Sequence, residues 1–216
     1  MPDLRIGTAG WSIPSILAGS FPPDGTGLER YAARFGCAEI NSTFHRSHRR
    51  STYERWVASV PVDFRFSAKL PKTITHGAGL ANAGDLTAAY LDEVAPLGKH
   101  LAVHLVQLPP KLAFDQDVAC TFFAALRART DRSIACEPRH PSWFGADADR
   151  VLSDFRIARV AADPARVEAA AIAGGWPGLV YHRLHGSPVM YRSSYDDGRL
   201  ERYAERIRAS LIGAAT

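Results

Sequence analysis

The chain has 216 residues, of which 46% are hydrophobic and 22% charged, and its formal net charge is +4 at pH 7. This composition is typical of a folded globular protein and excludes a disordered, collagen-like or disulfide-stapled chain. The modest net charge permits contacts with phosphate, but the sequence lacks the dense basic stripe of a dedicated nucleic-acid binder. Three separated cysteines, no signal-peptide layout and no long apolar run predict a cytoplasmic protein with no membrane partner.

Short strand-like runs alternate with helical patterns along the chain. Seven strands are predicted, at Leu4–Gly10, Ala38–Phe44, Phe64–Leu70, Leu101–Leu108, Ser133–Arg139, Ile157–Asp163 and Leu179–His185. Helices are predicted at Leu28–Phe35, Thr52–Ser59, Leu86–Leu97, Gln116–Arg129, Ser142–Ser153 and Leu200–Leu211. The capping-box spacing of Ser51 and Glu54 predicts a helix start there. The alternation predicts an α/β fold with a parallel sheet, and the even composition predicts a single domain over residues 1–216.

The links that follow strands are longer than those that follow helices. Residues 11–27, 71–84 and 186–199 form the longest of them. In a parallel sheet these links all leave the carboxyl ends of the strands, where α/β proteins bind ligands. This edge is therefore the predicted functional face.

Polar residues alternate with apolar ones along several predicted strands, although strands covered on both faces should be apolar throughout. We expect these polar side chains to point into the lumen of a barrel. They are Glu39, Asn41, Arg65, Lys69, Gln107, Glu137, Arg139, Asp163, Arg183 and His185. Buried charges must be paired or must await a ligand, so two interpretations stay open: an internal salt-bridge network and a ligand site.

Several blocks of sequence resemble the YecE-like family, catalogued as DUF72, a domain of unknown function. They are Ile6–Trp11, Glu39–Phe44, Phe64–Pro71 with Thr75 and His76, Gln107–Pro110, Glu137–Phe144, Asp163 and Arg183–Gly186. The resemblance covers almost the whole chain and implies a TIM (β/α) barrel. It implies no established activity.

The chain departs from the family pattern at its end. Seven βα units are recognisable, whereas family members continue into one more strand, so we expect an open or gapped barrel without its eighth strand. Unpaired strand edges invite association, which predicts either a homo-oligomer or a C-terminal helix that covers these edges. The basic run from His45 to Arg50 is a second departure.

The cations of the expected pocket indicate an anionic ligand. Lys69, Arg139 and Arg183 suit a phosphate or carboxylate group. Further ligand contacts are expected from Glu39, Asn41, Gln107, Trp11 and Trp143. We therefore expect an enzyme that acts on a small anionic, sugar-like molecule, although the sequence does not define its reaction class.

Four residues are candidates for the chemistry. Glu137 is the first candidate for general acid or base and Asp163 the second, while His185 can transfer protons near neutral pH. Lys69 is a candidate for Schiff-base formation. No cofactor is predicted; a divalent metal bound by carboxylates and His185 is the alternative.

Two other functions stay open. Arg46, Arg49 and Arg50 suit a metal-dependent phosphodiesterase or nucleic-acid-binding protein resembling TIM-barrel repair nucleases. If the absent strand carries essential residues, the chain is instead a non-catalytic remnant.

Overall fold

The computed structural model describes residues 4–213, with side chains described up to residue 209. The chain forms two compact units. The N-terminal unit comprises residues 4–107 and 124–133, and the C-terminal unit comprises residues 108–123 and those from 134 onward. Helix α4 (Gln116–Arg127) carries the chain from the C-terminal unit into the N-terminal unit. The prediction of a single domain over residues 1–216 stays a prediction.

The N-terminal unit contains four strands in a parallel arrangement. They are β1 (Gly7–Ala9), β2 (Cys37–Ile40), β3 (Arg65–Lys69) and β4 (Leu101–Gln107), which pair in chain order. In β3, Phe66 and Ala68 are fully buried on one face, and Ser67 and Lys69 are also buried on the other. The polar side chains of Ser67 and Lys69 are therefore covered, as expected from the alternation, whereas Arg65 is only half-buried.

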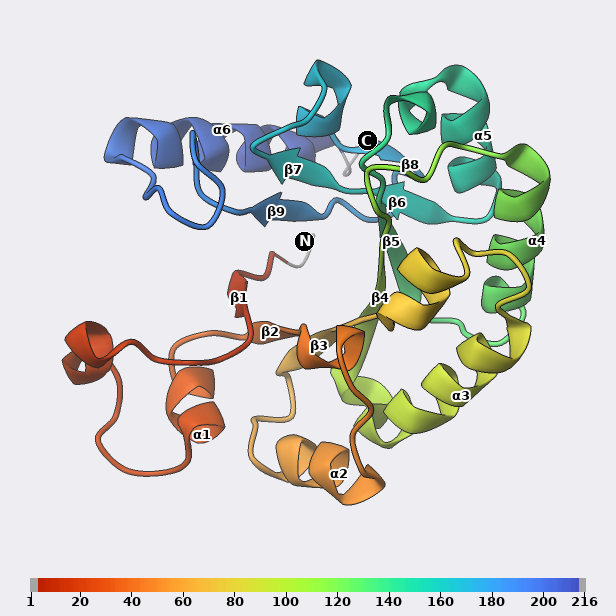
Figure 1. Cartoon of the computed structure of the whole chain (residues 1–216). Helices are drawn as coiled ribbons and strands as arrows, with labels where there is room; N and C mark the ends of the chain where they lie inside the picture. Colours follow the sequence, from red (N-terminus) through yellow and green to blue (C-terminus); the bar gives the residue numbers. More distant parts are fainter. Residues whose placement is uncertain (1–3, 214–216) are drawn as a thin grey trace. The chain divides into compact units, whose positions relative to one another are not determined.

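Helices α1 (Gly27–Ala32), α2 (Arg50–Ala58) and α3 (Gly84–Val94) belong to the same unit, and α1 and α2 lie on one side of β1–β3 (Figure 1). The predicted capping box at Ser51 and Glu54 is wrong. Helix α2 already begins at Arg50, so Ser51 lies inside it, and Glu54 pairs with Arg50 instead. A capping box does occur at Thr26 and Glu29, where it begins α1.

Most strands of the C-terminal unit have two or three residues, and the first has five. They are β5 (Ser133–Glu137), β6 (Ile157–Arg159), β7 (Ala161–Asp163), β8 (Gly174–Gly175) and β9 (His182–Leu184). Strands β5 and β6 pair in parallel, β8 joins β6 in antiparallel, and β7 pairs in parallel with β9. Helix α5 (Ala146–Asp154) packs against β6 and β8, while α6 (Asp197–Gly213) runs beside β7 (Figure 1).

The predicted strand over Ile157–Asp163 is divided in two. The amide of Val160 donates to Cys136 O, whereas the next amide, that of Ala161, donates to Tyr181 O. Because the chain changes pairing partner at this point, β6 belongs with β5, and β7 belongs with β9. The short β8, with two glycines, was not predicted.

Short helices complete the described fold. They are η1 (Ser15–Ser20), η2 (Ser42–Phe44), η3 (Thr73–Gly77), η4 (Ala95–His100), η5 (Pro141–Phe144) and η6 (Glu168–Ala171). The predicted helix Ser142–Ser153 is therefore η5 followed by α5. None of the helices within residues 4–213 has both the length and the apolar character needed to cross a membrane.

The predicted α/β class with mostly parallel strands is confirmed. Among residues 4–213 the strand pairings do not close into a barrel, so the TIM barrel implied by the family resemblance is not confirmed.

Candidate functional site

A buried carboxylate forms the centre of the candidate site in the C-terminal unit. Glu137, the last residue of β5, is only 2% exposed. Its Oε1 accepts a hydrogen bond from Arg139 Nε at 2.8 Å, and its Oε2 accepts one from Arg183 Nη1. Arg183 comes from β9 and is 7% exposed. The structure thus brings together three residues that the sequence placed in one pocket.

Electrostatics fix the charge of this cluster. Burial alone would raise the pKa of Glu137, but the guanidinium groups of Arg183 and Arg139 outweigh it and hold the pKa below its ordinary value. Glu137 is therefore ionised at neutral pH. The carboxylate of Glu137 therefore holds two guanidinium groups, those of Arg139 and Arg183, beside the pocket described next.

His185 and a small pocket lie beside this cluster. The Nε2 atom of His185 is 4.0 Å from Glu137 Oε2 and 3.4 Å from Arg183 Nη1. The pocket adjoins Glu137 and has a free volume of about 10 Å³, which is room for one water-sized group. Its lining residues are Glu137, Pro138, Arg139, Ala162, Pro164, Arg166, Ala170, His185 and Met190.

One donor at this pocket has no partner. The Nη2 atom of Arg139 is buried and finds no hydrogen-bond partner among residues 4–213. Leaving a charged donor unsatisfied in the interior costs about 1–3 kcal/mol or more. Arg139 and Arg166 both line the pocket, and an oxyanion would satisfy the unpartnered guanidinium nitrogen of Arg139.

Asp163 lies in the same unit but has different partners. Its carboxylate accepts hydrogen bonds from Tyr195 Oη at 2.7 Å and from Arg199 Nη2 at 3.0 Å. Its backbone oxygen accepts from the amide of His185. Asp163 therefore connects β7 to the segment after β9 and to α6. This role suits structural support better than general acid or base catalysis.

Lys69 and its neighbours lie in the N-terminal unit. Lys69, the last residue of β3, is buried, and its Nζ lies 3.9 Å from the ring centre of Phe44. The hydroxyl of Thr43 donates to the backbone oxygen of Lys69 at 2.6 Å. The lysine ammonium thus has an aromatic face for its charge, a favourable cation–π arrangement.

Other predicted ligand contacts belong to the same unit. Glu39 and Gln107 are buried at the ends of β2 and β4, and the buried Oδ1 of Asn41 has no hydrogen-bond partner among the described residues. Trp11 packs edge-to-face against Trp56, with ring centres 5.0 Å apart.

Trp143 does not line the pocket at Glu137. It is buried in the core of the C-terminal unit, where its Nε1 donates to Leu112 O at 3.0 Å and its ring contacts Phe114. Arg65, expected in the lumen, instead donates to the backbone oxygens of Val62 and Phe64.

Metal-binding chemistry has no preformed site in the described part of the chain. Within residues 4–213, no three side chains of His, Cys, Asp or Glu lie close enough together to hold a metal ion. The carboxylates expected as metal ligands include Glu137 and Asp163, both of which accept hydrogen bonds from arginine.

Several pocket and supporting residues were missed in the sequence. Arg166 and Met190 line the pocket, and Tyr195 and Arg199 hold Asp163. Met190, Tyr195 and Arg199 lie within the long link 186–199, so link length marked the segment. No residue pattern singled out these side chains within it.

Comparison with known proteins identifies the family. The sequence model described as "Protein of unknown function DUF72" matches residues 5–215. The UPF0759 protein YecE of Escherichia coli K12 is 29% identical over 172 residues, covering 77% of this chain and 61% of that protein. The protein of the same name from Escherichia coli O157:H7 is 29% identical over 141 residues, covering 65% of this chain and 50% of its own length. The chain thus spans less than two thirds of the length of these relatives.

Solved structures share the fold. A DUF72 family protein from Enterococcus faecalis V583 matches with a TM-score of 0.76 at 20% identity, covering 98% of this chain and 84% of that one. A DUF72 family protein from Thermotoga maritima MSB8 matches with a TM-score of 0.70 at 20% identity, covering 97% of this chain and 86% of that one. Since the family model spans nearly the entire sequence, the chain belongs to the DUF72, YecE-like family of proteins of unknown function.

Proposed function

We propose that the protein is an enzyme that binds a small phosphate- or carboxylate-bearing substrate at the pocket beside Glu137. The observation that carries this proposal is the buried Nη2 of Arg139, which has no hydrogen-bond partner among residues 4–213 and belongs to a residue that lines the pocket. An oxyanion at this position supplies the missing hydrogen-bond acceptor.

The size of the pocket limits which part of the ligand is buried. Free volume of about 10 Å³ accepts one oxygen-sized group, so the anionic head enters and the rest of the molecule stays at the opening. Arg166 lines the pocket and is exposed, so it adds positive charge where the substrate enters. A sugar-like body with several hydroxyl groups suits this exposed position.

His185 is the best-placed group for proton transfer. Both oxygens of Glu137 already accept hydrogen bonds from arginine, and the lowered pKa of Glu137 makes it a weak base. His185 lines the same pocket, and an imidazole exchanges protons near neutral pH. We assign Glu137 the role of holding Arg139 and Arg183 in place, and His185 that of general acid or base.

Calorimetric titration with phosphate compounds tests this function. Inorganic phosphate and a sugar phosphate are titrated into the protein, with the unphosphorylated sugar as the neutral comparison. We expect the two anions to bind and the neutral sugar to bind much more weakly. Arg139→Gln should weaken anion binding at least tenfold, because a hydrogen bond to a charged group is lost.

Arg150→Gln is the matched control. Arg150 is an exposed arginine of the same unit that pairs with Asp147 on the surface, so anion affinity should be unchanged. Arg166→Gln provides a second test that does not alter the Glu137 ion pairs. Equal affinities in Arg139→Gln, Arg166→Gln and the unmodified protein would overturn the proposal.

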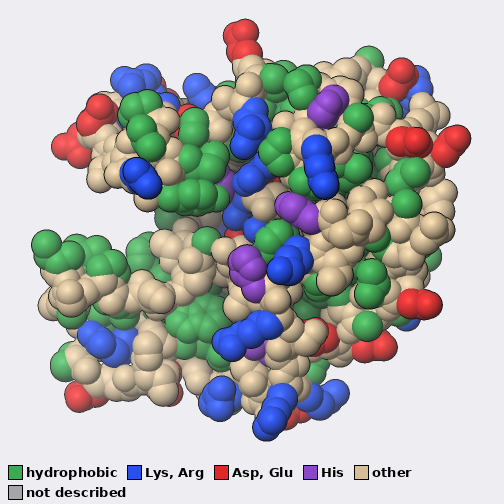
Figure 2. Space-filling view, viewed as in Figure 1, with side chains coloured by type: hydrophobic (Ala, Val, Ile, Leu, Met, Phe, Trp, Pro, Cys, Tyr) green, Lys and Arg blue, Asp and Glu red, His purple; other side chains and the backbone are tan. Residues whose placement is uncertain are grey.

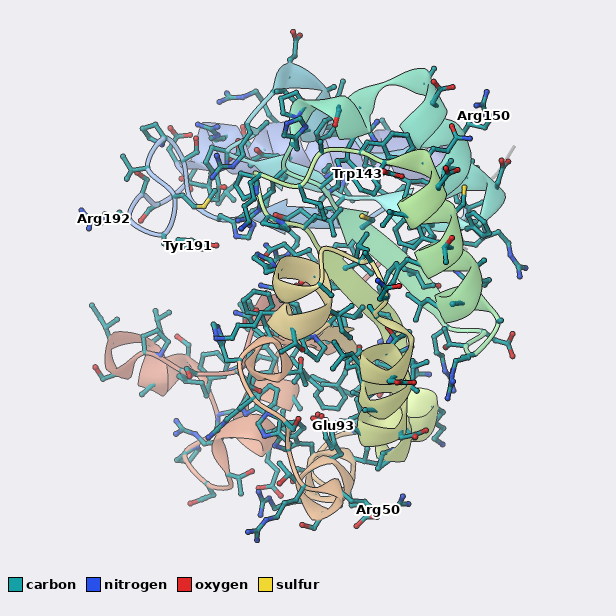
Figure 3. The ribbon with its side chains drawn as sticks, turned by 45° about the vertical axis from the view of Figure 1, so that its right-hand side comes forward. Arg50, Glu93, Trp143, Arg150, Tyr191 and Arg192 are labelled. Carbon is teal, nitrogen blue, oxygen red and sulfur yellow. The ribbon has the colours of Figure 1, made fainter. Side chains whose placement is uncertain are left out.

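A nucleic-acid-binding function is a second candidate, supported by the surface around α2. Lys and Arg side chains gather over this helix in Figure 2. The exposed arginines of this segment are Arg46, Arg49, Arg50 and Arg55. Glu93 of α3 holds the segment in place, since it accepts from the amide of His48 at 2.8 Å and from Tyr53 Oη at 2.6 Å, and it faces α2 in Figure 3.

Salt-dependent binding distinguishes this second candidate. Binding to a DNA duplex should weaken steeply as salt rises and vanish in a triple Arg46, Arg49 and Arg50 to Gln variant, whereas Arg139→Gln should leave it unchanged. Absence of binding at about 50 mM salt would rule out this candidate.

For the fold, we propose a (β/α) barrel that is open at its eighth strand. Parallel pairing within each unit and the likeness to solved structures of the family support this arrangement. An experimental structure in which an eighth strand closes the barrel would contradict it.

A further inference from the structure

A second cavity lies in the C-terminal unit, apart from the pocket at Glu137. Its volume is about 470 Å³, within the range of about 300–1,000 Å³ usual for small-molecule sites. It is formed by the chain from Ala171 to His182 together with Arg206 of α6. The two cavities share no lining residue, although Ala170 lines the first and its neighbour Ala171 lines the second.

The lining of this cavity is predominantly apolar. Ile172, Trp176, Leu179 and Val180 contribute to it, and Ile172 is 62% exposed. These side chains lie together in one cavity, and a contiguous apolar surface that remains in contact with water is typical of a binding site, unlike single exposed apolar residues.

The floor of the cavity is held by β8. The amide of Trp176 donates to Ile157 O at 2.9 Å, and the amide of Gly175 donates to Asp149 Oδ1 at 3.0 Å. Gly174 lies against the guanidinium of Arg159, where a Cβ would collide with it. The apolar wall therefore rests on backbone hydrogen bonds and is preformed.

The charged side chain that lines the cavity is positive. None of the lining residues is acidic, while Arg206 provides a full positive charge and His182 is half-buried near it. Among the described side chains no carboxylate pairs with Arg206, whose guanidinium lies 5.6 Å from the ring centre of Tyr203. The ligand that best complements this cavity has an apolar body and one anionic group at the α6 side.

We propose that this cavity binds an apolar monocarboxylate of the medium-chain fatty acid class, with its chain against Ile172 and Trp176 and its carboxylate on Arg206. The planar guanidinium fork matches the two oxygens of a carboxylate. This site is independent of the anion pocket at Glu137.

Calorimetry with decanoate tests the proposal, and decan-1-ol serves as the probe without charge. We expect one decanoate per chain, bound more tightly than decan-1-ol. Arg206→Gln should weaken decanoate binding about tenfold or more and leave decan-1-ol binding unchanged. Ile172→Asp should abolish both, because it places a carboxylate in the apolar wall. Arg202→Gln is the matched control, because Arg202 is an exposed arginine of α6 outside the cavity lining. This variant should bind decanoate normally.

Three results would overturn the proposal. The first is no decanoate binding by the unmodified protein. The second is decanoate binding that Arg206→Gln and Ile172→Asp both leave intact, which indicates nonspecific adsorption. The third is a dimer in light scattering that Ile172→Asp dissociates, because a second copy then covers the cavity. Circular dichroism of each variant confirms that it is folded, and Arg139→Gln should bind decanoate normally.

Discussion

The two units each bury a polar network, and the networks differ in charge. In the C-terminal unit, Glu137 is bound by two arginines, and one guanidinium nitrogen finds no partner among residues 4–213. In the N-terminal unit, Tyr90 Oη donates to Ala68 O at 3.0 Å and contacts His104 Nδ1 at 2.9 Å. His104 Nε2 lies 3.2 Å from Thr130 Oγ1.

The neutral network is complete without a ligand. Since the single proton of Tyr90 goes to Ala68 O, the Nδ1 of His104 must donate to Tyr90, and Nε2 must accept from Thr130. Burial, with smaller contributions from Arg127 and Arg132, lowers the pKa of His104 to about 4 and keeps it uncharged. Burial of polar groups alone therefore does not indicate a site: the unsatisfied and charged network does.

The largest expected effect comes from removing the charge of Glu137. Glu137→Gln removes the buried carboxylate that accepts hydrogen bonds from the buried Arg183 and the half-buried Arg139, which should cost about 3–5 kcal/mol of unfolding free energy. Urea denaturation measures this loss. Asp147→Asn, at an exposed ion pair with Arg150, should change stability by less than about 0.5 kcal/mol. A Glu137→Gln variant as stable as this control would show that the charged network is not needed for the fold.

Mild acid should affect the neutral network first. His104 has a pKa of about 4 in the folded protein against 6.5 when unfolded, so the unfolded state binds more protons between these values. Stability is then fully present above pH 6.5 and decreases as the pH falls, by about 2 kcal/mol between pH 7 and pH 5. Thermal unfolding across this range measures it.

His104→Gln is the variant that isolates this contribution. The pKa values of His48 and His182 are also lowered, chiefly by burial, and their share of the pH dependence remains in the variant. Glu137 affects stability only at lower pH. Because its pKa is lowered in the folded protein, its stabilising contribution is lost only when the pH falls below the ordinary carboxyl pKa. An unchanged slope between pH 7 and pH 5 in His104→Gln would contradict this assignment.

Removing one hydroxyl from the neutral network should have a smaller effect. Tyr90→Phe leaves Ala68 O and His104 Nδ1 without their buried partner, at a cost of about 1–2 kcal/mol. Chemical denaturation at pH 7.5 measures it while His104 is neutral. The pH slope of the variant should persist, since burial is the main cause of the lowered pKa of His104.

The smallest effect is expected at the surface. Arg50 and Glu54 of α2 form an exposed ion pair at 2.7 Å, and such pairs contribute about 0.3–0.5 kcal/mol. Glu54→Gln should therefore remain close to the unmodified protein in urea denaturation and become indistinguishable from it at high salt. A loss comparable to that of Tyr90→Phe would mean that exposure is a poor guide to these energies.

The sequence predicted some parts of this structure well. Alternating polar and apolar residues placed β3 correctly and anticipated that Lys69 is buried, because strand periodicity is a local property. The grouping of Glu137, Arg139, Arg183 and His185 also followed from strand position and family resemblance.

Other parts depend on contacts distant in sequence. The break between β6 and β7 results from a change of partner at Val160, which no local pattern records. Likewise, the partners of Asp163, which are Tyr195 and Arg199, lie more than thirty positions away in sequence, and no local pattern indicated them. The start of α2 at Arg50, ahead of the Ser51 pattern, shows that capping-box spacing alone does not locate the start of a helix.

The hydrogen bonds around Asp163 have a consequence for local unfolding. Tyr195 Oη donates to the carboxylate of Asp163 and accepts a hydrogen bond from the amide of Gly186. The second bond closes the segment from Gly186 to Tyr195 into a loop, in which Tyr191 and Arg192 extend into solvent (Figure 3). Arg199 attaches the start of α6 to the same carboxylate. The segment after β9 and the first turn of α6 should therefore open together, and hydrogen exchange at the amide of His185 should report that shared opening rather than unfolding of the whole chain.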